Sequence, residues 1–473
     1  MSSEARSKLL AMGGFFGISL LAGVLVAGLV APAAAFTGVG GAIVATSLTE
    51  VPIFLETKPQ AERTTVYLAN GKVLTEFYDE NRIIVGLDEI AKVMIDAQVA
   101  IEDDRFFEHG ALDLKSLIKA SLGFVGGGDT GGGSTLTQQY VKQVLMEEAV
   151  QNPDPIEREE ELARVQARTI ERKLLEMRYA LFLEERHSKE WILENYLNIA
   201  YYGDGSYGVE AAAHHYFAVT AADLTLGQAA VLAGIVQTPS RNPVNDPEGA
   251  YARRDVVLDR MEELGLVTAE EVEEAKAEVW DPKKVTYPKN GCYGLAKYGQ
   301  VCRLVWEYLM NNEALGKTEG ERQRKIMRGG YEIHTYIDPE KQDAVQSAVS
   351  NYIAATDPVV SAMVVIQPGT GIILGAAQNR SVYGFDIAKG ESAYLSFAPA
   401  YLGGDQGYQA GSTFKGFTVA AALKAGYPPA KKLNAKGFIS FTGKTFRSCD
   451  GAFPAQGFPV QNTSQNGVMD MYK

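Results

Sequence analysis

The sequence predicts a multidomain protein in which one N-terminal transmembrane helix precedes a mainly α-helical domain and a partial α+β domain. Three observations support this. The chain has 473 residues, enough for two or three domains of roughly 100–200 residues each. It begins with a long uncharged apolar run. Its periodicity then changes from helical to strand-like near Tyr331.

Composition narrows the class of protein. Hydrophobic residues make up 46% of the chain and charged residues 22%, as in ordinary globular proteins. The net charge is −13, with a pI near 5.1, which argues against a nucleic-acid partner because such partners bind through phosphate neutralisation. A local basic cluster can still hold an anionic substrate.

The predicted membrane anchor covers residues 9–36, which carry no charge, and follows a cytoplasmic tail at residues 1–8. A bilayer core needs about 20 apolar helical residues. Arg6 and Lys8 precede the run, so the positive-inside rule places the N-terminus in the cytoplasm. The alternative is a cleaved signal peptide ending at Ala33-Ala34-Ala35, but a signal core is typically about 7–15 residues long. Residues after about Thr46 therefore lie outside the cytoplasm.

An extracytoplasmic location permits disulfides. Cys292 and Cys302 are expected to form one, and the alternative is two independent buried thiols. Cys449 is left over.

Elements follow in order along the chain. Alternation around Asn70-Gly71 predicts a β-hairpin over Thr64–Phe77. Apolar residues at three- and four-residue spacing predict helices from Leu87 to about Gly265. Within that stretch, the acidic segment 147–161 contains two prolines and is interpreted as a solvated connection.

The later part of the chain has strand character. Residues 281–335 resemble an interdomain connector, and Pro368–Gly371 is expected to turn a second hairpin. A helix is expected to begin near Ser412 and to stop at Gly426, because two prolines follow.

The first candidate site motif is IEDDRFFEHGALD, residues 101–113. A carboxylate such as Glu102 beside apolar surface has a raised pKa and can act as an acid or base near neutral pH. Considered alone, the motif also fits a helix end with solvated acids.

The second motif, residues 126–143, is a glycine-rich run that leads into Ser134, the expected N-cap of a helix from Thr135. Backbone N–H groups at such a helix start attract anions, and Lys142 lies two turns along. A flexible linker before a polar helix is the alternative. The motif does not have the Walker A pattern.

The third and fourth motifs lie on predicted helices. Arg172 and Lys173 are placed to pair with Glu176, and surface ion pairing is the default interpretation. Farther on, Glu194 and Asn198 are one turn apart. His214 and His215 are adjacent, but no third ligand is indicated, so no metal site is predicted.

The fifth motif is QAGSTFK, residues 409–415, in which Ser412 and Lys415 are three residues apart at a helix start. This spacing brings a lysine amine near a serine hydroxyl that is a candidate nucleophile.

Taken together and in order, these segments resemble a bifunctional class A penicillin-binding protein. Its glycosyltransferase family 51 pattern matches in five segments, and the resemblance extends from about Val66 onward. The segments are EDxxFxxHG at Glu102–Gly110, GGSTxTQQ at Gly132–Gln139, RKxxE at Arg172–Glu176, ILExYLNxxxxG at Ile192–Gly203 and AVLAGIVQTPSRNP at Ala230–Pro243.

The resemblance implies a lysozyme-like glycosyltransferase domain at residues 60–265, a linker with the cysteine pair at 266–335, and the N-terminal part of a penicillin-binding transpeptidase domain at 336–473. The first domain would polymerise lipid II into β-1,4 glycan at the membrane. Its expected catalytic residues are Glu102, as general base, and Glu176. The expected substrate-binding residues are Ser134, Thr135, Gln138, Lys142, Arg172, Lys173 and Asn198.

In the second domain, the resemblance implies that Ser412 attacks the D-Ala-D-Ala bond with Lys415 as its base, and that β-lactams acylate the same serine. The family's downstream SxN and KTG motifs are not found in their expected context: Ser464–Asn466 is interpreted as a chance match, and Lys444–Phe446 is not KTG. The chain ends 61 residues after Ser412. This half is therefore expected to be truncated and inactive.

The resemblance also sets expectations for partners. These are lipid II, nascent glycan, the membrane, a β-lactam at Ser412 if that domain folds, and other cell-wall synthesis proteins. The expected location is the bacterial cell membrane. No cofactor is required, although Mg²⁺ or Mn²⁺ assistance is compatible with the family. The alternatives are a glycan-cleaving lytic enzyme and a non-catalytic anchored scaffold.

Overall fold

The computed structural model describes residue 55 and residues 57–471, apart from 114–133, 153, 168, 405–409, 449–450, 456, 458 and 462–465. The predicted anchor at residues 9–36 lies outside the described residues. Among those that are described, no helix is both long and apolar enough to cross a membrane. The chain divides into two compact units, which meet at Gly403 and Gly404.

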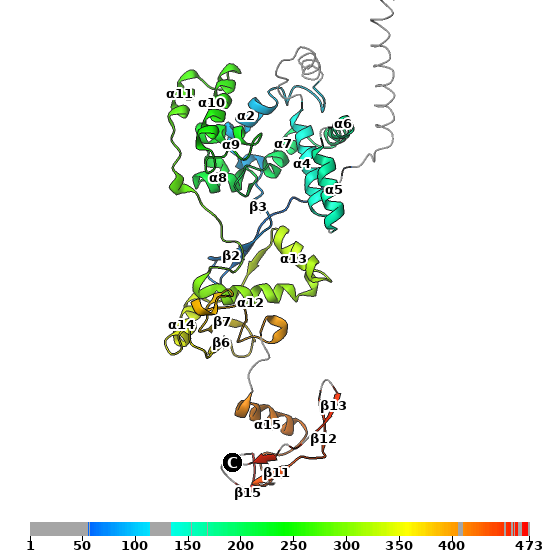
Figure 1. Cartoon of the computed structure of the whole chain (residues 1–473), viewed down its shortest axis with the longest axis vertical. Helices are drawn as coiled ribbons and strands as arrows, with labels where there is room; N and C mark the ends of the chain where they lie inside the picture. The colour runs from blue at the N-terminus through cyan, green and yellow to red at the C-terminus, as the bar shows by residue number, and fades with distance from the viewer. Residues whose placement is uncertain are drawn as a thin grey trace, which may run out of the picture. The chain divides into compact units, whose positions relative to one another are not determined.

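The first unit opens with two strands and then becomes helical (Figure 1). Its helical part extends from the short strand β3 to α11. The elements are β3 (Asn81–Arg82), α2 (Lys92–Glu102), α4 (Leu136–Val150), α5 (Pro155–Gln166), α6 (Ile170–Glu184), α7 (Lys189–Ile199), β4 (Ser206–Tyr207), α8 (Val209–Phe217), α9 (Leu226–Ile235), α10 (Pro247–Glu263) and α11 (Ala269–Ala277). The helices predicted between Leu87 and Gly265 are thus confirmed.

Helix α9 is the centre of this helical part. Its sequence LGQAAVLAGI is apolar on nearly every side, as expected of a helix that is buried all round. Thr225 and Gln228 form a capping box that fixes its start. The helix packs against α2, which carries Glu102, and against α10.

A second core lies between the helical part and Gly403. A three-stranded sheet has the order β2-β1-β5, with β1 (Thr64–Tyr67) antiparallel to β2 (Val73–Phe77) and parallel to β5 (Glu332–His334). The chain therefore leaves this sheet, forms the helices, and returns to it. The other elements of this region are α12 (Gly299–Met310), α13 (Glu319–Arg328), α14 (Pro339–Ser350), β6 (Ala362–Ile366), β7 (Ile373–Gln378), β8 (Val382–Tyr383) and β9 (Glu391–Ser392).

Both predicted hairpins are confirmed. β1 and β2 pair around Gly71, whose φ of 78° is in the left-handed region that a glycine adopts without strain. β6 and β7 pair around Gly369 and Gly371, whose φ angles are 77° and 76°.

Two interpretations of connecting segments need correction. Segment 147–161 was expected to be a solvated connection, but α4 continues to Val150 and α5 begins at Pro155. Asp154 caps α5 by accepting hydrogen bonds from two backbone N–H groups, and proline suits the first helical position. Segment 281–335 was expected to be a connector, yet it contains α12, α13 and part of a hydrophobic core.

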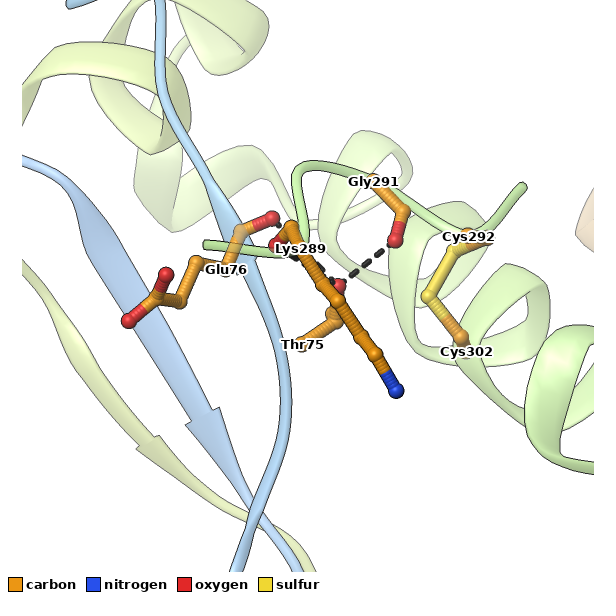
Figure 2. The surroundings of a disulfide bond; sticks show 6 residues. All are labelled: Thr75, Glu76, Lys289, Gly291, Cys292 and Cys302. Carbon is orange, nitrogen blue, oxygen red and sulfur yellow. Dashed lines mark hydrogen bonds between the residues drawn. A yellow bond between two sulfur atoms is a disulfide. The ribbon is translucent and has the colours of Figure 1, made fainter. Parts of the chain in front are cut away.

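The predicted disulfide between Cys292 and Cys302 is confirmed. Figure 2 shows how it joins the segment beside β2 to helix α12. The Thr75 hydroxyl donates to the Gly291 carbonyl at 2.6 Å, and Glu76 N–H donates to the Lys289 carbonyl at 3.1 Å. The disulfide therefore fastens to α12 a segment that is already hydrogen-bonded to the edge of the sheet.

Replacing both cysteines, in Cys292→Ala/Cys302→Ala, is expected to lower the free energy of unfolding of this core by about 2–3 kcal/mol. The crosslink closes a short loop and so restricts the unfolded chain. Urea unfolding can be followed by the fluorescence of Trp306, which packs 4.9 Å from Phe77 between ring centroids. Cys449→Ala is the control for loss of a thiol. An unchanged midpoint in the double variant would contradict the prediction.

In its described residues, the second unit contains an α-helix and paired strands. Helix α15 (Phe414–Lys424) begins just after a turn at Gly411–Thr413 and ends before Gly426, as predicted. The strand pairs are β10 (Leu433–Ala435) with β15 (Gly467–Met469), β11 (Phe438–Ser440) with β14 (Pro459–Gln461), and β12 (Thr445–Ser448) with β13 (Gly451–Pro454).

Candidate active site

Glu102 is the last residue of α2, and its carboxylate faces α4. Gln139 Nε2 donates a hydrogen bond of 2.8 Å to Glu102 Oε2. Gln139 Oε1 in turn accepts a hydrogen bond of 3.1 Å from the hydroxyl of Tyr196 on α7. Two hydrogen bonds therefore link side chains of α2, α4 and α7 at this point.

The environment of Glu102 alters its proton affinity. Burial raises the pKa of its carboxyl, and the nearby Asp103 carboxylate adds to that effect. The hydrogen bond from Gln139 and the charge of Arg253 on α10 act in the opposite direction, and burial is the largest effect. A carboxyl with a raised pKa can take up a proton near neutral pH, as a general base must.

The start of α4 differs from the expectation by one residue. Thr135, not Ser134, is the N-cap, and its side chain accepts a hydrogen bond from Gln138 N–H at 3.3 Å. Asp103 Oδ2 accepts from Leu136 N–H at 3.1 Å, so the first motif provides a second cap for the second motif's helix. This leaves the Ser134 side chain available for another contact.

Ser134 contacts the basic cluster of α6. Lys173 Nζ donates to Ser134 Oγ at 2.5 Å and also lies 3.3 Å from Glu176 Oε2. Arg172 forms an ion pair with the other Glu176 oxygen. Glu176 is only 3% exposed. Burial lowers the pKa of Lys173, while the Glu176 carboxylate raises it.

The segment Ser134–Gln139 therefore contacts both Glu102 on α2 and the basic cluster of α6. Gln139 reaches Glu102, and Ser134 reaches Lys173. Lys142, on the same helix, makes no ion pair with a described residue, and its charge helps to lower the pKa of Lys173. This arrangement places the carboxylate of Glu102 and several cations around the first turns of one helix.

Thr135 and Gln138 point away from solvent. Both are buried, and each donates to the carbonyl of Ala111, at 3.1 Å and 3.4 Å. They fasten the end of the first motif to α4. Their expected contact with the donor substrate stays a prediction.

Asn198 is also held within the protein. It is 2% exposed, and its side chain exchanges hydrogen bonds with the backbone of Val85, accepting at 3.1 Å and donating at 2.8 Å. The backbone carbonyl of Asn198 accepts a hydrogen bond of 2.9 Å from Nε of the buried Arg82. A substrate-binding role for Asn198 is likewise still a prediction.

The histidine pair has structural partners. His215 Nε2 is 2.8 Å from Asp204 Oδ2, and its Nδ1 is 2.7 Å from the Thr286 carbonyl oxygen. His214 pairs with Glu210 at 2.9 Å. Within the described residues, no group of three or more His, Cys, Asp or Glu residues is arranged to hold a metal ion.

In the second unit, Ser412 lies in the turn before α15, and Lys415 lies in the first turn of that helix. Both are exposed. No hydrogen bond joins them in the described part of the chain.

Sequence reasoning missed Gln139, Tyr196 and Arg253 as residues around Glu102. The first two fall inside the quoted motifs, GGSTxTQQ and ILExYLN. The motif letters alone do not say which of two adjacent glutamines faces α2. Arg253 lies on α10, far from Glu102 in sequence, and its charge acts on the Glu102 carboxylate.

Comparisons with known proteins match two family profiles to successive parts of the chain. The transglycosylase family profile matches residues 70–262, and the penicillin binding protein transpeptidase domain profile matches residues 361–464. Penicillin-binding protein 1A/1B of Bacillus subtilis is 30% identical over 358 residues, covering 74% of this chain and 36% of that protein. Penicillin-binding protein 1A of Mycobacterium tuberculosis is 31% identical over 373 residues, covering 77% and 40%.

Among solved structures, penicillin-binding protein 1A from Haemophilus influenzae aligns with 86% of this chain and 40% of its own length, at 18% identity and a TM-score of 0.34. The chain thus spans about two fifths or less of the length of these relatives.

Proposed function

Because the chain belongs to the class A, bifunctional penicillin-binding proteins, we propose that its helical domain is a peptidoglycan glycosyltransferase that polymerises lipid II into β-1,4 glycan. The observation that carries the proposal is the segment Ser134–Gln139, which contacts the half-buried carboxylate of Glu102 at one end and Lys173 of α6 at the other.

The reaction needs a base and a stabilised leaving group. The 4-hydroxyl of the acceptor sugar attacks C1 of the donor sugar, and Glu102 takes the hydroxyl proton. The bond between C1 and the diphosphate oxygen breaks, and the lipid diphosphate leaves with that electron pair. Negative charge develops on the diphosphate, where fixed cations and helix N–H groups stabilise it most.

The cations of α6 suit that second task. Arg172 and Lys173 are held by Glu176, so their positions are fixed before the substrate binds. We assign diphosphate binding to these two residues and to Lys142. Glu176 acts by orienting them. No step of this mechanism passes through a metal ion, and assistance by Mg²⁺ or Mn²⁺ stays a prediction.

The location follows from the substrate. Lipid II is anchored in a membrane, so we propose that residues 9–36 form a single-pass anchor in the bacterial cell membrane, with the catalytic part outside the cytoplasm. The proposed partners are lipid II, nascent glycan and other cell-wall synthesis proteins.

The first experiment is polymerisation of labelled lipid II by the detergent-solubilised full chain, with product length read on a gel. Long glycan supports the polymerase. Short fragments released from added glycan, without polymer, would favour a lytic enzyme. A folded chain that does neither would overturn the proposal and favour a non-catalytic scaffold.

For the second unit we propose a serine transpeptidase segment that lacks acylation activity in this chain. Ser412 and Lys415 are both exposed and are not hydrogen-bonded to each other, so nothing among the described residues activates the hydroxyl.

We therefore expect a fluorescent penicillin to label the full chain no more than it labels Ser412→Ala. The measurement is in-gel fluorescence with mass spectrometry of the labelled peptide. One label per chain, lost in Ser412→Ala, would contradict this expectation.

A further inference from the structure

The Tyr196 hydroxyl is connected to the candidate base, Glu102, by two successive hydrogen bonds through Gln139. It donates to Gln139 Oε1 at 3.1 Å, and Gln139 Nε2 donates to Glu102 Oε2 at 2.8 Å. Tyr196 is 1% exposed. A buried hydrogen-bonded network of this kind fixes the geometry of its members more strongly than an exposed one does.

The chain of contacts also sets the orientation of the Gln139 amide. Burial raises the pKa of Tyr196 well above its usual value, so its hydroxyl keeps its proton and can donate it. The amide oxygen is the acceptor that this hydroxyl needs, and the amide NH₂ group is then directed at Glu102. In the reversed orientation the amide oxygen would face the carboxylate, and two acceptors would repel each other.

Several charged and polar groups surround Glu102. Asp103 follows it on α2 and disfavours its charged form, whereas Arg253 on α10 and Gln139 on α4 favour it. Tyr196 contributes from α7. Of these groups, Gln139 is the one that donates a hydrogen bond to the carboxylate among the described residues.

We propose that Tyr196 is a positioning residue for the glycosyltransferase reaction. Its hydroxyl locks the Gln139 amide so that one carboxylate oxygen of Glu102 is always hydrogen-bonded and the other is free to accept the proton of the acceptor hydroxyl. This inference rests on the proposed function, because it assumes that Glu102 is the base.

The chain offers a matched control. Tyr202 is also fully buried, and its hydroxyl has no hydrogen-bond partner among the described residues. Tyr196→Phe and Tyr202→Phe therefore each remove one buried oxygen atom, but only the first removes a hydrogen bond to Gln139. Thermal unfolding of both variants shows whether each still folds.

The expected results concern the dependence of the polymerisation rate on pH. Without the hydrogen bond from Tyr196, Gln139 stabilises the Glu102 carboxylate less well, so the pKa of Glu102 rises. Tyr196→Phe should shift the acidic limb of the profile upward by about half a unit, lower the rate on that limb by about threefold, and recover the rate at higher pH. Tyr202→Phe should keep the wild-type profile.

A second measurement does not depend on activity. The infrared carboxyl band that disappears in Glu102→Gln reports the protonation of Glu102 directly. Its midpoint should be higher in Tyr196→Phe than in wild type and in Tyr202→Phe. If the wild type makes no polymer, this titration still tests the hydrogen-bond chain, while the polymerase proposal fails separately.

Two outcomes would overturn the inference. One is a Tyr196→Phe variant with the same pH profile and the same carboxyl midpoint as Tyr202→Phe. The other is a uniform loss of rate at every pH with an unmoved midpoint, which would indicate only a structural role for Tyr196.

Discussion

Glu102→Gln is expected to reduce lipid II polymerisation by roughly 10²–10⁴-fold, which is the usual contribution of a general base. Glutamine keeps the size of the side chain and a group that can face Gln139, but it cannot take the proton from the acceptor hydroxyl. The fold should survive, because Glu102 ends α2 and makes no ion pair among the described residues. The measurement is the initial rate of polymer formation at saturating lipid II.

Glu108→Gln is the control for this variant. It makes the same chemical change six residues away at an exposed position, and it should keep the wild-type rate. The rate of the wild type should fall in acid at a higher pH than for an ordinary glutamate, because burial raises the pKa of Glu102. A Glu102→Gln variant that retains more than a tenth of the wild-type rate would exclude Glu102 as the base.

The second large effect is expected for Lys173→Met. Methionine has a similar length but no charge, so the leaving diphosphate loses a cation where its negative charge develops. By comparison with the removal of other electrostatic donors, the rate should fall by roughly 10²–10³-fold. The loss should appear mainly in kcat, because the interaction strengthens as the C1–oxygen bond breaks.

Lys92→Met is the matched control, since it removes a lysine charge from α2 at a side chain that is 82% exposed. It should leave the rate unchanged. A circular dichroism melt of Lys173→Met tests whether the loss of the contacts to Ser134 and Glu176 has unfolded the start of α4. A folded variant with less than a fivefold loss would rule out Lys173 as a major contact of the leaving group.

Local sequence patterns predicted the secondary structure well where the conformation depends only on neighbouring residues. The Asn70-Gly71 turn and the stop of α15 at Gly426 both follow from backbone angles that glycine adopts easily. The acidic segment 147–161 was misinterpreted because its composition indicated a loop. The pairing of Asp154 with Pro155 as cap and first helical residue outweighed that composition.

The candidate site was predicted in part, for a related reason. Helical spacing puts Arg172 and Lys173 beside Glu176 without knowledge of the fold. The contact of Gln139 with Glu102 and Tyr196 depends on how three helices pack, and no local rule gives that packing. For the same reason the sequence suggested Ser134 as the cap of α4, whereas its contact with Lys173 on α6 leaves that role to Thr135.

The parallel pairing of β1 with β5 has a consequence for synthesis of the chain. Tyr67 and Glu332 belong to paired strands but are 265 residues apart in sequence. At roughly 5–20 residues per second, a ribosome takes on the order of 10–50 s to make that interval. During this time the nascent β1–β2 hairpin presents an unpaired strand edge, which other chains can join. A chain that stops before β5 keeps that strand edge unpaired.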